Sequence, residues 1–320
     1  MKKYQVLFFG TPEIALPTLH SLAESEEIEV AAVVTQSDKP AGRHMEVTQS
    51  AVKVFAEKKG IPVLQPETLR GNKEFAELIR ELKPDAFVII SYGQIIPKKI
   101  LEIPKHGALN IHVSLLPKYR GASPIQQALL NNDNATGITI IKINERMDAG
   151  DIIFVKKLLI SDKDNAGILS QKLGVLGGEF IVPVLLDYME DHLKPIPQNH
   201  AQATFCSKIE KDDGRIKWEE QTAQEIFNRI RAFTPWPSCF TAWDGKRMKI
   251  IEARVGDEKI KPGTMEILSG EKKLPLAIGT KKGSIHPVKI QLEGKGLIDI
   301  KTFLNGNKEK ILKSPRLEPL

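Results

Sequence analysis

Short apolar runs alternate with amphipathic stretches over the first 190 residues of the chain. The runs are rich in Val, Ile, Leu and Phe, which is typical of strands buried on both faces of a sheet. The stretches between them carry apolar residues at helical spacing, as at Leu16, Leu19 and Leu22. Strands that alternate with helices predict a doubly wound, Rossmann-like α/β fold with a mostly parallel sheet. The predicted strands are residues 5–9, 30–35, 61–64, 86–90, 107–112, 137–143 and 152–159, and a long helix over 165–189 follows them.

After residue 208 the pattern changes to short β-like segments separated by Gly and Lys. One amphipathic helix is predicted over 222–232, and the segments beyond it favour a small OB-like β-barrel, closed or nearly closed. We therefore predict an N-terminal domain at 1–189, a linker rich in proline at 190–208, and a C-terminal barrel domain at 209–320. The predicted barrel segments are 240–243, 249–255, 263–268, 276–280, 283–292 and 298–303.

Two turns in the N-terminal half have local signals of their own. Thr11 is predicted to cap the helix that follows it, because Pro12 suits the first helical position. Residues 37–47, which include Pro40 and Gly42, are predicted to form a loop.

Polar residues gather where predicted strands end, which is where doubly wound sheets bind their ligands. Gly10-Thr11, Ser91–Ile96 and the pair Asn110 and His112 occupy such positions. Residues i and i+2 of a strand point to the same side, so the amide and the imidazole of that pair share a face. Such a pair can hold an oxyanion and move a proton, and Asp148 offers a carboxylate farther along the chain. This equipment suits acyl transfer without a nucleophilic serine or cysteine.

Composition excludes several classes of protein. A chain of 320 residues suits two domains. It has no uninterrupted run of 18 apolar residues and no signal peptide, so we expect no transmembrane helix and no membrane partner. Cys206 and Cys239 are too few for a disulfide framework or a zinc site, which favours a cytoplasmic protein without a bound metal. Gly10 lacks the rest of G-x-G-x-x-G, which disfavours an NAD-dependent dehydrogenase.

The positive charge lies in the C-terminal third. Residues 1–208 carry 24 Lys and Arg against 24 Asp and Glu, whereas residues 209–320 carry 22 against 16. The whole formal excess of +6 therefore falls in the predicted barrel domain. This asymmetry indicates either a polyanionic partner such as a nucleic acid or simply a basic solvated surface, and charge alone leaves both open.

The stretch from Asn110 to Gly121 reads Asn-x-His-x-Ser-Leu-Leu-Pro-Lys-Tyr-Arg-Gly. In this motif the chain resembles the 10-formyltetrahydrofolate-dependent formyltransferases. Further segments agree with that family, and some of them match the branch that acts on initiator methionyl-tRNA. The family segments are Phe9–Glu13, Ser91–Pro97, Thr136–Thr139 and Met147–Ile152, and those of the branch are Lys39–Arg43, Ser207–Ile209, Asp213–Ile216 and Ile230–Pro237.

The resemblance implies a role for individual residues. It implies that Asn110, His112 and Asp148 are catalytic. Ser114 lacks the surroundings of a nucleophilic serine, so we interpret it as a turn or pocket hydroxyl. The residues implied to bind folate are Ser91, Tyr92, Gly93, Gln94, Ile95, Ile96, Ser114, Leu115, Leu116, Pro117 and Arg146, and those implied to contact the tRNA or its aminoacyl end are Gly10, Thr11, Arg43 and Lys208.

The implied reaction uses 10-formyltetrahydrofolate as formyl donor, and its partner is the acceptor stem of initiator methionyl-tRNA, bound by a monomer. The chain departs from the family after Arg43, where His44-Met45-Glu46 replaces the usual Gly-Lys-Lys, so this loop has fewer cations for phosphate contacts. Formyl transfer to a nucleotide amino sugar, hydrolysis of the formyl folate, and RNA binding without catalysis remain alternatives. The basic C-terminal part favours tRNA over the sugar, and the complete Asn–His–Asp set favours an enzyme.

Overall fold

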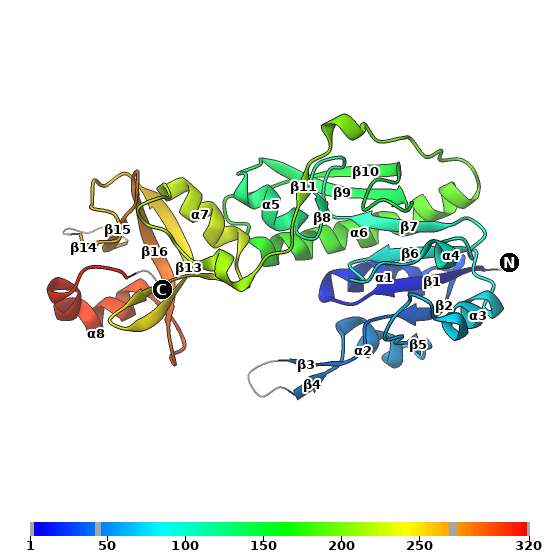
Figure 1. Ribbon diagram of the computed structural model, residues 1–320, viewed down its shortest axis with the longest axis horizontal. Coiled ribbons are helices and arrows are strands. Elements are labelled where there is room, and N and C mark those ends of the chain that lie inside the picture. Colours follow the sequence, from blue (N-terminus) through cyan, green and yellow to red (C-terminus); the bar gives the residue numbers. More distant parts are fainter. Residues whose placement is uncertain (1–2, 42–45, 269–273, 319–320) are drawn as a thin grey trace. The chain divides into compact units, whose positions relative to one another are not determined.

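The computed structural model describes residues 3–41, 46–268 and 274–318. Its contacts divide the chain into two compact units, each of which is shown in Figure 1. Unit 1 comprises Met1–Pro124, Ala135–Leu159 and Ser170–Cys206. Unit 2 comprises Ile125–Asn134, Ile160–Leu169 and Ser207–Leu320.

Unit 1 is built on a sheet of seven strands. These are β1 (Tyr4–Gly10), β2 (Ile28–Val34), β5 (Val63–Leu64), β6 (Ala86–Ile90), β7 (Ala108–His112), β9 (Ala135–Lys142) and β10 (Asp151–Leu159). Their order is β10-β9-β7-β6-β1-β2-β5, as Figure 1 shows. The five strands from β7 to β5 are parallel, whereas β9 is antiparallel to both of its neighbours. The predicted mostly parallel sheet is therefore confirmed.

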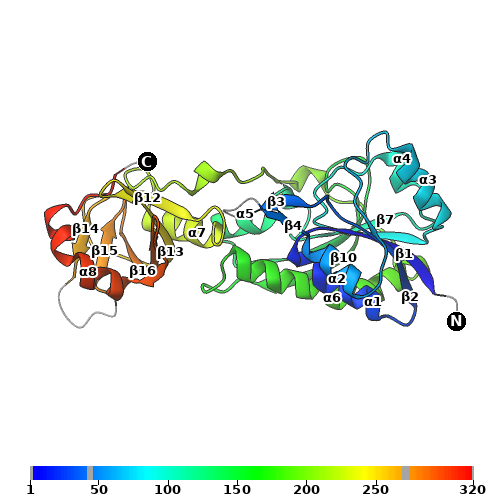
Figure 2. The same cartoon turned by 90° about the horizontal axis from the view of Figure 1, so that it is seen from below.

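Helices cover both faces of this sheet (Figure 2), which confirms the doubly wound architecture. Because successive strand residues alternate in direction, Leu7 and Phe9 face one side, where they pack with Phe75 and Ile79. That side carries α3 (Lys73–Glu81) and α4 (Lys98–Leu101), and the other carries α1 (Leu16–Glu24), α2 (Ala51–Lys58) and α6 (Ala166–Met189). The remaining elements of unit 1 are η1 (Glu13–Ala15), β3 (Lys39–Ala41), β4 (Glu46–Thr48), β8 (Arg120–Gly121), η2 (His200–Gln202) and β11 (Phe205–Cys206).

The helix α6 is long and apolar enough, by length and composition, to cross a membrane. An uninterrupted apolar run is absent from this helix because Lys172 and Glu179 interrupt it, so the sequence predicted the helix without this property. Leu173, Ile181 and Leu185 of this helix are completely buried in the fold. It is therefore a core helix of unit 1.

Two glycines let α6 pack directly against η1 and the first turn of α1. A Cβ atom on Gly174 would stand 2.8 Å from the carbonyl oxygen of Ile14, and one on Gly178 would stand 2.7 Å from that of Pro17. Both distances are shorter than any normal carbon–oxygen contact. The close packing of these two helices therefore requires glycine.

Thr11 does not cap a helix, contrary to the prediction. The helical turn η1 begins after Pro12, and no side chain caps it. The hydroxyl of Thr11 instead donates to the carbonyl oxygen of Tyr92 at 3.1 Å and accepts from the backbone N–H of Gln36 at 3.3 Å. These partners come from neighbouring strand ends, which sequence spacing does not reveal.

Two further local predictions were wrong. The predicted loop at 37–47 contains a short antiparallel ribbon, because β3 pairs with β4. The predicted strand at 298–303 is mostly helix: β17 (Leu297–Asp299) ends at once, and α8 (Ile300–Lys313) begins. The cause is Asp299, whose carboxylate accepts from the N–H of Thr302 and so caps the helix.

Unit 2 contains an antiparallel sheet in the order β12-β13-β16-β15-β14, with β17 paired to β16. Its C-terminal segment hydrogen-bonds to both edges: Glu318 pairs with Ala242 at one edge, and Leu317 donates to the carbonyl of Gly263 beside the other. The sheet is thus nearly closed, as predicted. The elements not yet given are α5 (Pro124–Leu130), η3 (Lys211–Gly214), α7 (Ala223–Ala232), β12 (Cys239–Trp243), β13 (Lys246–Gly256), β14 (Met265–Ile267), β15 (Leu276–Gly279) and β16 (Ser284–Leu292).

Gly178→Ala should lower the melting temperature, because the added methyl group has to displace the Pro17 backbone. Gly306→Ala is the matched control, since it lies in α8 with no atom within 4 Å of an added Cβ. There the intrinsic helix propensity of alanine should stabilise by about 0.5–1 kcal/mol. Calorimetry measures both, and equal shifts in the two variants would contradict the close packing of α6.

Candidate active site

The end of β7 holds the first two candidate residues. Asn110 pairs in register with Ile89 of β6, and His112 pairs with Thr139 of β9. His112 is buried at 6% exposure, whereas Asn110 is half-buried. The Asn110 carboxamide has no hydrogen-bond partner among the residues that the structure describes. Its donor is thus available to a ligand.

The imidazole of His112 lies between two acceptors. Its Nε2 is 2.9 Å from the carbonyl oxygen of Tyr119, and its Nδ1 is 3.5 Å from Oδ1 of Asp148. The first distance is that of a normal hydrogen bond, whereas the second is longer than one. The Nε2 side is therefore fixed by the backbone, whereas the Nδ1 side faces the carboxylate without a normal hydrogen bond to it.

Asp148 has an unusual backbone conformation. Its φ of 48° lies in the left-handed region, which is uncommon for residues other than glycine. Its Oδ2 accepts a hydrogen bond of 2.8 Å from the N–H of Gly121, while Oδ1 faces His112. The carboxylate therefore connects the loop between β9 and β10 to the segment that follows β7.

A buried carboxamide supports this loop from behind. Gln198, at 6% exposure, donates to the carbonyl oxygens of Asp148 at 2.8 Å and Gly150 at 2.7 Å. Its own Oε1 accepts from Nε and Nη2 of Arg120, and that Nη2 also lies 2.9 Å from Nδ1 of His200. Burial lowers the pKa of the Arg120 guanidinium, and the Asp148 carboxylate opposes this shift.

Sequence reasoning missed Gln198 because prolines surround it, which is typical of a linker. The segment instead runs along unit 1: Ile196 pairs with Ile152 of β10, and β11 pairs with β8. Proline suits such an edge segment, since it need not donate a hydrogen bond there. The available signal was Arg120, because a buried arginine in the motif requires a partner.

The loop after β6 is held through its backbone. The carbonyl oxygen of Tyr92 accepts from Thr11 and, at 2.9 Å, from Nε2 of Gln36. The ring of Tyr92 packs edge-on against Phe9, and burial raises its pKa to about 12. Gly93 has a φ of 83°, and a Cβ there would lie 2.3 Å from the Gln36 amide. Tyr92 is therefore an anchor of the loop.

The other predicted residues of this loop lie nearer the surface. Ser91 and Gly93 are exposed, Gln94 and Ile96 are half-buried, and Ile95 is 88% exposed. An apolar side chain so exposed at a strand end is available to an apolar part of a ligand.

Residues Ser114–Pro117 form a turn that is closed by its own hydrogen bonds. The hydroxyl of Ser114 is completely buried and donates to the carbonyl of Lys118 at 2.5 Å. Thr139 donates to the Ser114 carbonyl at 2.7 Å and accepts from the N–H of Leu116 at 3.1 Å. Of the two interpretations of Ser114, the turn hydroxyl is therefore the one that the contacts support. This turn positions Tyr119 beneath His112.

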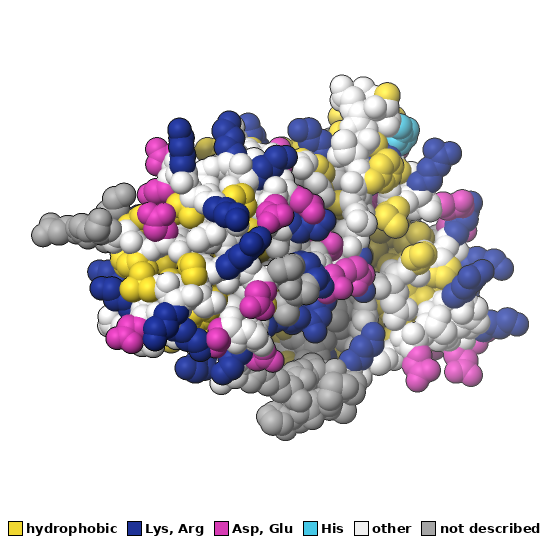
Figure 3. Space-filling model, turned by 60° about the vertical axis from the view of Figure 1, so that its left-hand side comes forward, with side chains coloured by type: hydrophobic (Ala, Val, Ile, Leu, Met, Phe, Trp, Pro, Cys, Tyr) yellow, Lys and Arg dark blue, Asp and Glu magenta, His cyan; other side chains and the backbone are white. Residues whose placement is uncertain are grey.

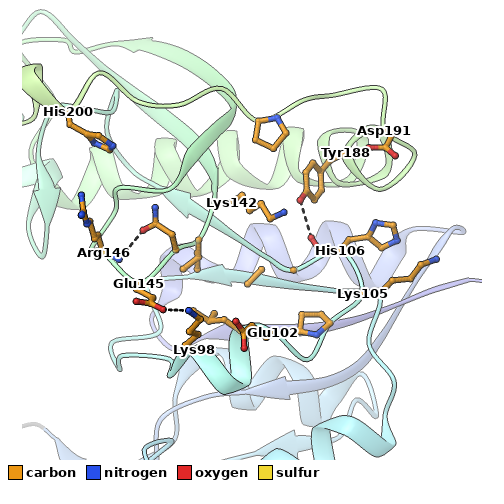
Figure 4. A pocket seen from close by; sticks show the side chains of 17 residues that line it. Lys98, Glu102, Lys105, His106, Lys142, Glu145, Arg146, Tyr188, Asp191 and His200 are labelled. Carbon is orange, nitrogen blue, oxygen red and sulfur yellow. Dashed lines mark hydrogen bonds and ion pairs between the residues drawn. The ribbon is translucent and has the colours of Figure 1, made fainter.

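A cleft of about 850 Å³ is lined by residues at the start of β7 and in the loop between β9 and β10, and it is shown in Figure 4. It meets β7 at Ala108, two residues before Asn110, and it meets the loop before Asp148 at Arg146. Figure 4 shows the ion pair between Lys98 and Glu145 at its wall. Of the predicted folate residues, Arg146 lines this cleft. Its other lining residues include Leu101, Lys142, Ile143, Asn144, Tyr188 and His200.

The predicted tRNA contacts that the structure describes belong to both units. Gly10 is buried at the end of β1, where it pairs with Ile90, and Thr11 is engaged by its neighbours. Lys208 is exposed at the start of the last segment of unit 2. Arg43 lies outside the described residues.

Comparison with known proteins gives consistent results over both units. Residues 2–185 match the family model "Formyl transferase", and residues 208–308 match "Formyl transferase, C-terminal domain". The chain is 40% identical to a methionyl-tRNA formyltransferase of Thermodesulfovibrio yellowstonii over 303 residues, which cover 95% of this chain and 96% of that protein. It is 41% identical to one of Listeria monocytogenes over 313 residues, 98% of each.

Solved structures share the fold. The N-formyltransferase from Helicobacter canadensis, solved with folinic acid and dTDP-3-aminofucose, aligns with a TM-score of 0.63 at 23% identity. The alignment covers 91% of this chain and 98% of that one.

Proposed function

The chain belongs to the formyl transferase family, and on that premise we propose that it transfers the formyl group of 10-formyltetrahydrofolate to the α-amino group of methionyl-tRNA. The initiator tRNA is the proposed acceptor, and the products are N-formylmethionyl-tRNA and tetrahydrofolate. We propose a monomer that works in the cytoplasm. The relatives that bear the name of this activity match nearly the whole chain, so the support extends over both units.

One observation carries the proposed chemistry: the Asp148 carboxylate faces the His112 imidazole on the strand that also holds Asn110. Asn110 and His112 lie two residues apart on β7, and Asp148 reaches His112 from the neighbouring loop. The set has hydrogen-bond donors and a proton acceptor, and none of the three needs to become a covalent intermediate. Direct attack of the substrate amine on the formyl carbon suits such a site.

In the proposed reaction the acceptor supplies its own nucleophile. An α-amino group has an ordinary pKa of about 7.7–8.0, so part of it is neutral near pH 7.5. Its nitrogen bonds to the formyl carbon, and the carbonyl oxygen becomes an oxyanion. Nδ2 of Asn110 and the Nδ1 side of protonated His112 donate to that oxygen. One such donor is typically worth about 3–4 kcal/mol of barrier.

The intermediate then collapses with a balanced movement of protons. The amine nitrogen loses a proton to Asp148, directly or through a water. Asp148 then passes that proton to N10 of the folate, directly or through a water, while the oxyanion re-forms the carbonyl, the bond between N10 and the formyl carbon breaks, and tetrahydrofolate leaves. Asp148 suits this relay because one of its oxygens is held by Gly121 while the other stays on the open side of His112.

The cleft that Ala108 and Arg146 line is the proposed place of the pterin ring. Its volume of about 850 Å³ falls within the range of small-molecule pockets. It offers apolar surface from Leu101 and Ile143 together with polar groups from Asn144 and Arg146. A flat heterocycle with hydrogen-bonding edges requires this combination. Ile95, from the loop after β6, is the proposed apolar contact at the surface.

Unit 2 has a lysine-rich pocket of about 890 Å³, lined by four lysines and also by Asp257 and Glu258, and its excess of lysine suits the phosphates of an RNA. Lys259 and Lys261 come from the segment after β13, and Lys281 and Lys282 come from the turn between β15 and β16. None of the four forms a salt bridge with another described residue. Figure 3 shows that Lys and Arg side chains are spread over the face it views, with Asp and Glu between them. We propose that these lysines position the tRNA through its backbone rather than by reading bases.

An acceptor panel tests the proposal. The protein is incubated with 10-formyltetrahydrofolate and, in separate reactions, initiator methionyl-tRNA, elongator methionyl-tRNA, free methionine, a nucleotide amino sugar, or no acceptor. We expect formyl transfer to the initiator methionyl-tRNA, measured as acid-precipitable radiolabelled formyl. Formylation of the sugar alone, or release of formate without an acceptor, would replace this proposal by one of the two alternative enzymes.

Two variants separate chemistry from binding in the same assay. His112→Ala should lower turnover by about 10²–10³-fold, because it removes one donor to the oxyanion. It should leave tRNA binding unchanged. Wild-type turnover in this variant would remove His112 from the mechanism.

The double variant Lys281→Glu, Lys282→Glu should weaken tRNA binding at low salt. If each lysine contacts a phosphate, the slope of log affinity against log salt should fall by about two units. Lys308→Glu, Lys313→Glu is the control of equal charge, placed on the exposed side of α8. Filter binding at several salt concentrations measures both double variants. Identical slopes would mean that the pocket lysines contribute no more to tRNA binding than other surface lysines, which would contradict the proposed role of the pocket.

A further inference from the structure

We infer that Gln198 is a positioning residue that holds Asp148 in the conformation needed for catalysis. The inference rests on the proposed function for the role of Asp148 itself. Gln198 does not reach the reacting atoms. It acts through the backbone of the loop that carries Asp148.

All the hydrogen-bonding capacity of this carboxamide is used. One N–H donates to the carbonyl of Asp148 at 2.8 Å and the other to that of Gly150 at 2.7 Å. Its oxygen accepts two hydrogen bonds from Arg120, at 3.2 and 2.6 Å. A buried amide that makes four hydrogen bonds with three residues of two other segments has one possible orientation. Gln198 therefore fixes the distance between the Asp148 loop and Arg120.

The loop needs such support because of its backbone. Asp148 adopts a φ of 48°. This conformation costs a residue other than glycine free energy, so it persists only where the surrounding structure imposes it. The two carbonyls that Gln198 binds belong to Asp148 itself and to Gly150, two residues later, so Gln198 holds the backbone of the turn directly. In this turn Oδ2 meets the N–H of Gly121 and Oδ1 faces His112. The contact between the carboxylate and the imidazole thus depends on the turn.

Arg120 completes this hydrogen-bond network, which we call the clasp: Gln198, Arg120, Gly121 and the Asp148 loop. It precedes Gly121, whose N–H binds the Asp148 carboxylate, so the same short strand holds both the carboxylate and Gln198. Its guanidinium is buried at 5% exposure and points at the Gln198 oxygen and at Nδ1 of His200. A positive charge buried there favours an acceptor oxygen at position 198 and a carboxylate nearby. The three segments are therefore held by one continuous network.

Gln198→Ala and Gln198→Glu test the inference against a matched control. The glutamate keeps the size and the acceptor for Arg120, but when ionised it has no donor for the two loop carbonyls. Both variants should lower kcat by about 10²-fold, as expected when a reacting group is displaced by about 1 Å. Binding of uncharged tRNA should not change. Gln202→Ala, an exposed glutamine of the same segment, should retain wild-type kcat.

A double-variant cycle distinguishes positioning from general support of the fold. If Gln198 acts only through the carboxylate, Gln198→Ala should cause no further loss of kcat in an Asp148→Asn background. Additive losses, or a loss that follows a lowered melting temperature, would overturn the inference. So would wild-type kcat in the alanine variant.

A readout without turnover keeps the inference separate from the proposed reaction. In hydrogen–deuterium exchange, Gln198→Ala should raise the exchange of backbone amides in residues 146–150 selectively. Unchanged exchange there would refute the inference even if the enzyme formylates methionyl-tRNA. Raised exchange together with formylation of another acceptor would support the positioning role of Gln198 and overturn only the proposed acceptor.

Discussion

The contact between the Asp148 carboxylate and the segment that follows β7 is the constraint on which the site depends. One oxygen accepts from the N–H of Gly121, and the other faces His112 at 3.5 Å. Because β9 is antiparallel to β7, its last residue Lys142 pairs with Leu109 near the start of β7, away from the strand end that holds His112. The loop that leaves β9 therefore has to fold back to bring Asp148 to His112. Its hydrogen bonds with Gly121 and Gln198 hold it in that path.

The two units divide the proposed work by chemistry. Unit 1 holds the Asn–His–Asp set and the cleft at the start of β7, and residues 1–208, which contain both, carry equal numbers of positive and negative side chains. Unit 2 has a nearly closed sheet and holds the lysine-rich pocket. Transfer of a one-carbon group needs a few precisely positioned catalytic atoms, whereas binding an RNA needs many weak contacts with phosphates. The different charge balances of residues 1–208 and 209–320 agree with these different demands.

The sequence predicted the features that depend on local order. Alternating runs and helical spacing indicate the strands and most helices, and the i, i+2 rule places Asn110 and His112 on one face of β7. The connection of Asp148 to this pair came from a resemblance, since no spacing rule spans the intervening residues. Gln198 was missed because its partners are backbone carbonyls 48 and 50 residues away. The predicted cap at Thr11 failed for the same reason: Tyr92, 81 residues away, competes for its hydroxyl. The helix α8 was missed although Asp299 is a local signal, because the residues around it also suit a strand.

The central claim is that the amide of Asn110 and the imidazole of His112 meet at the carbon that is transferred. A crystal structure with a stable analogue of 10-formyltetrahydrofolate tests it most directly. The account predicts that the formyl oxygen lies about 3 Å from Nδ2 of Asn110 and within reach of His112, with the pterin ring in the cleft lined by Leu101, Ile143 and Arg146. An analogue whose formyl group points away from both side chains, or whose ring binds elsewhere, would contradict it.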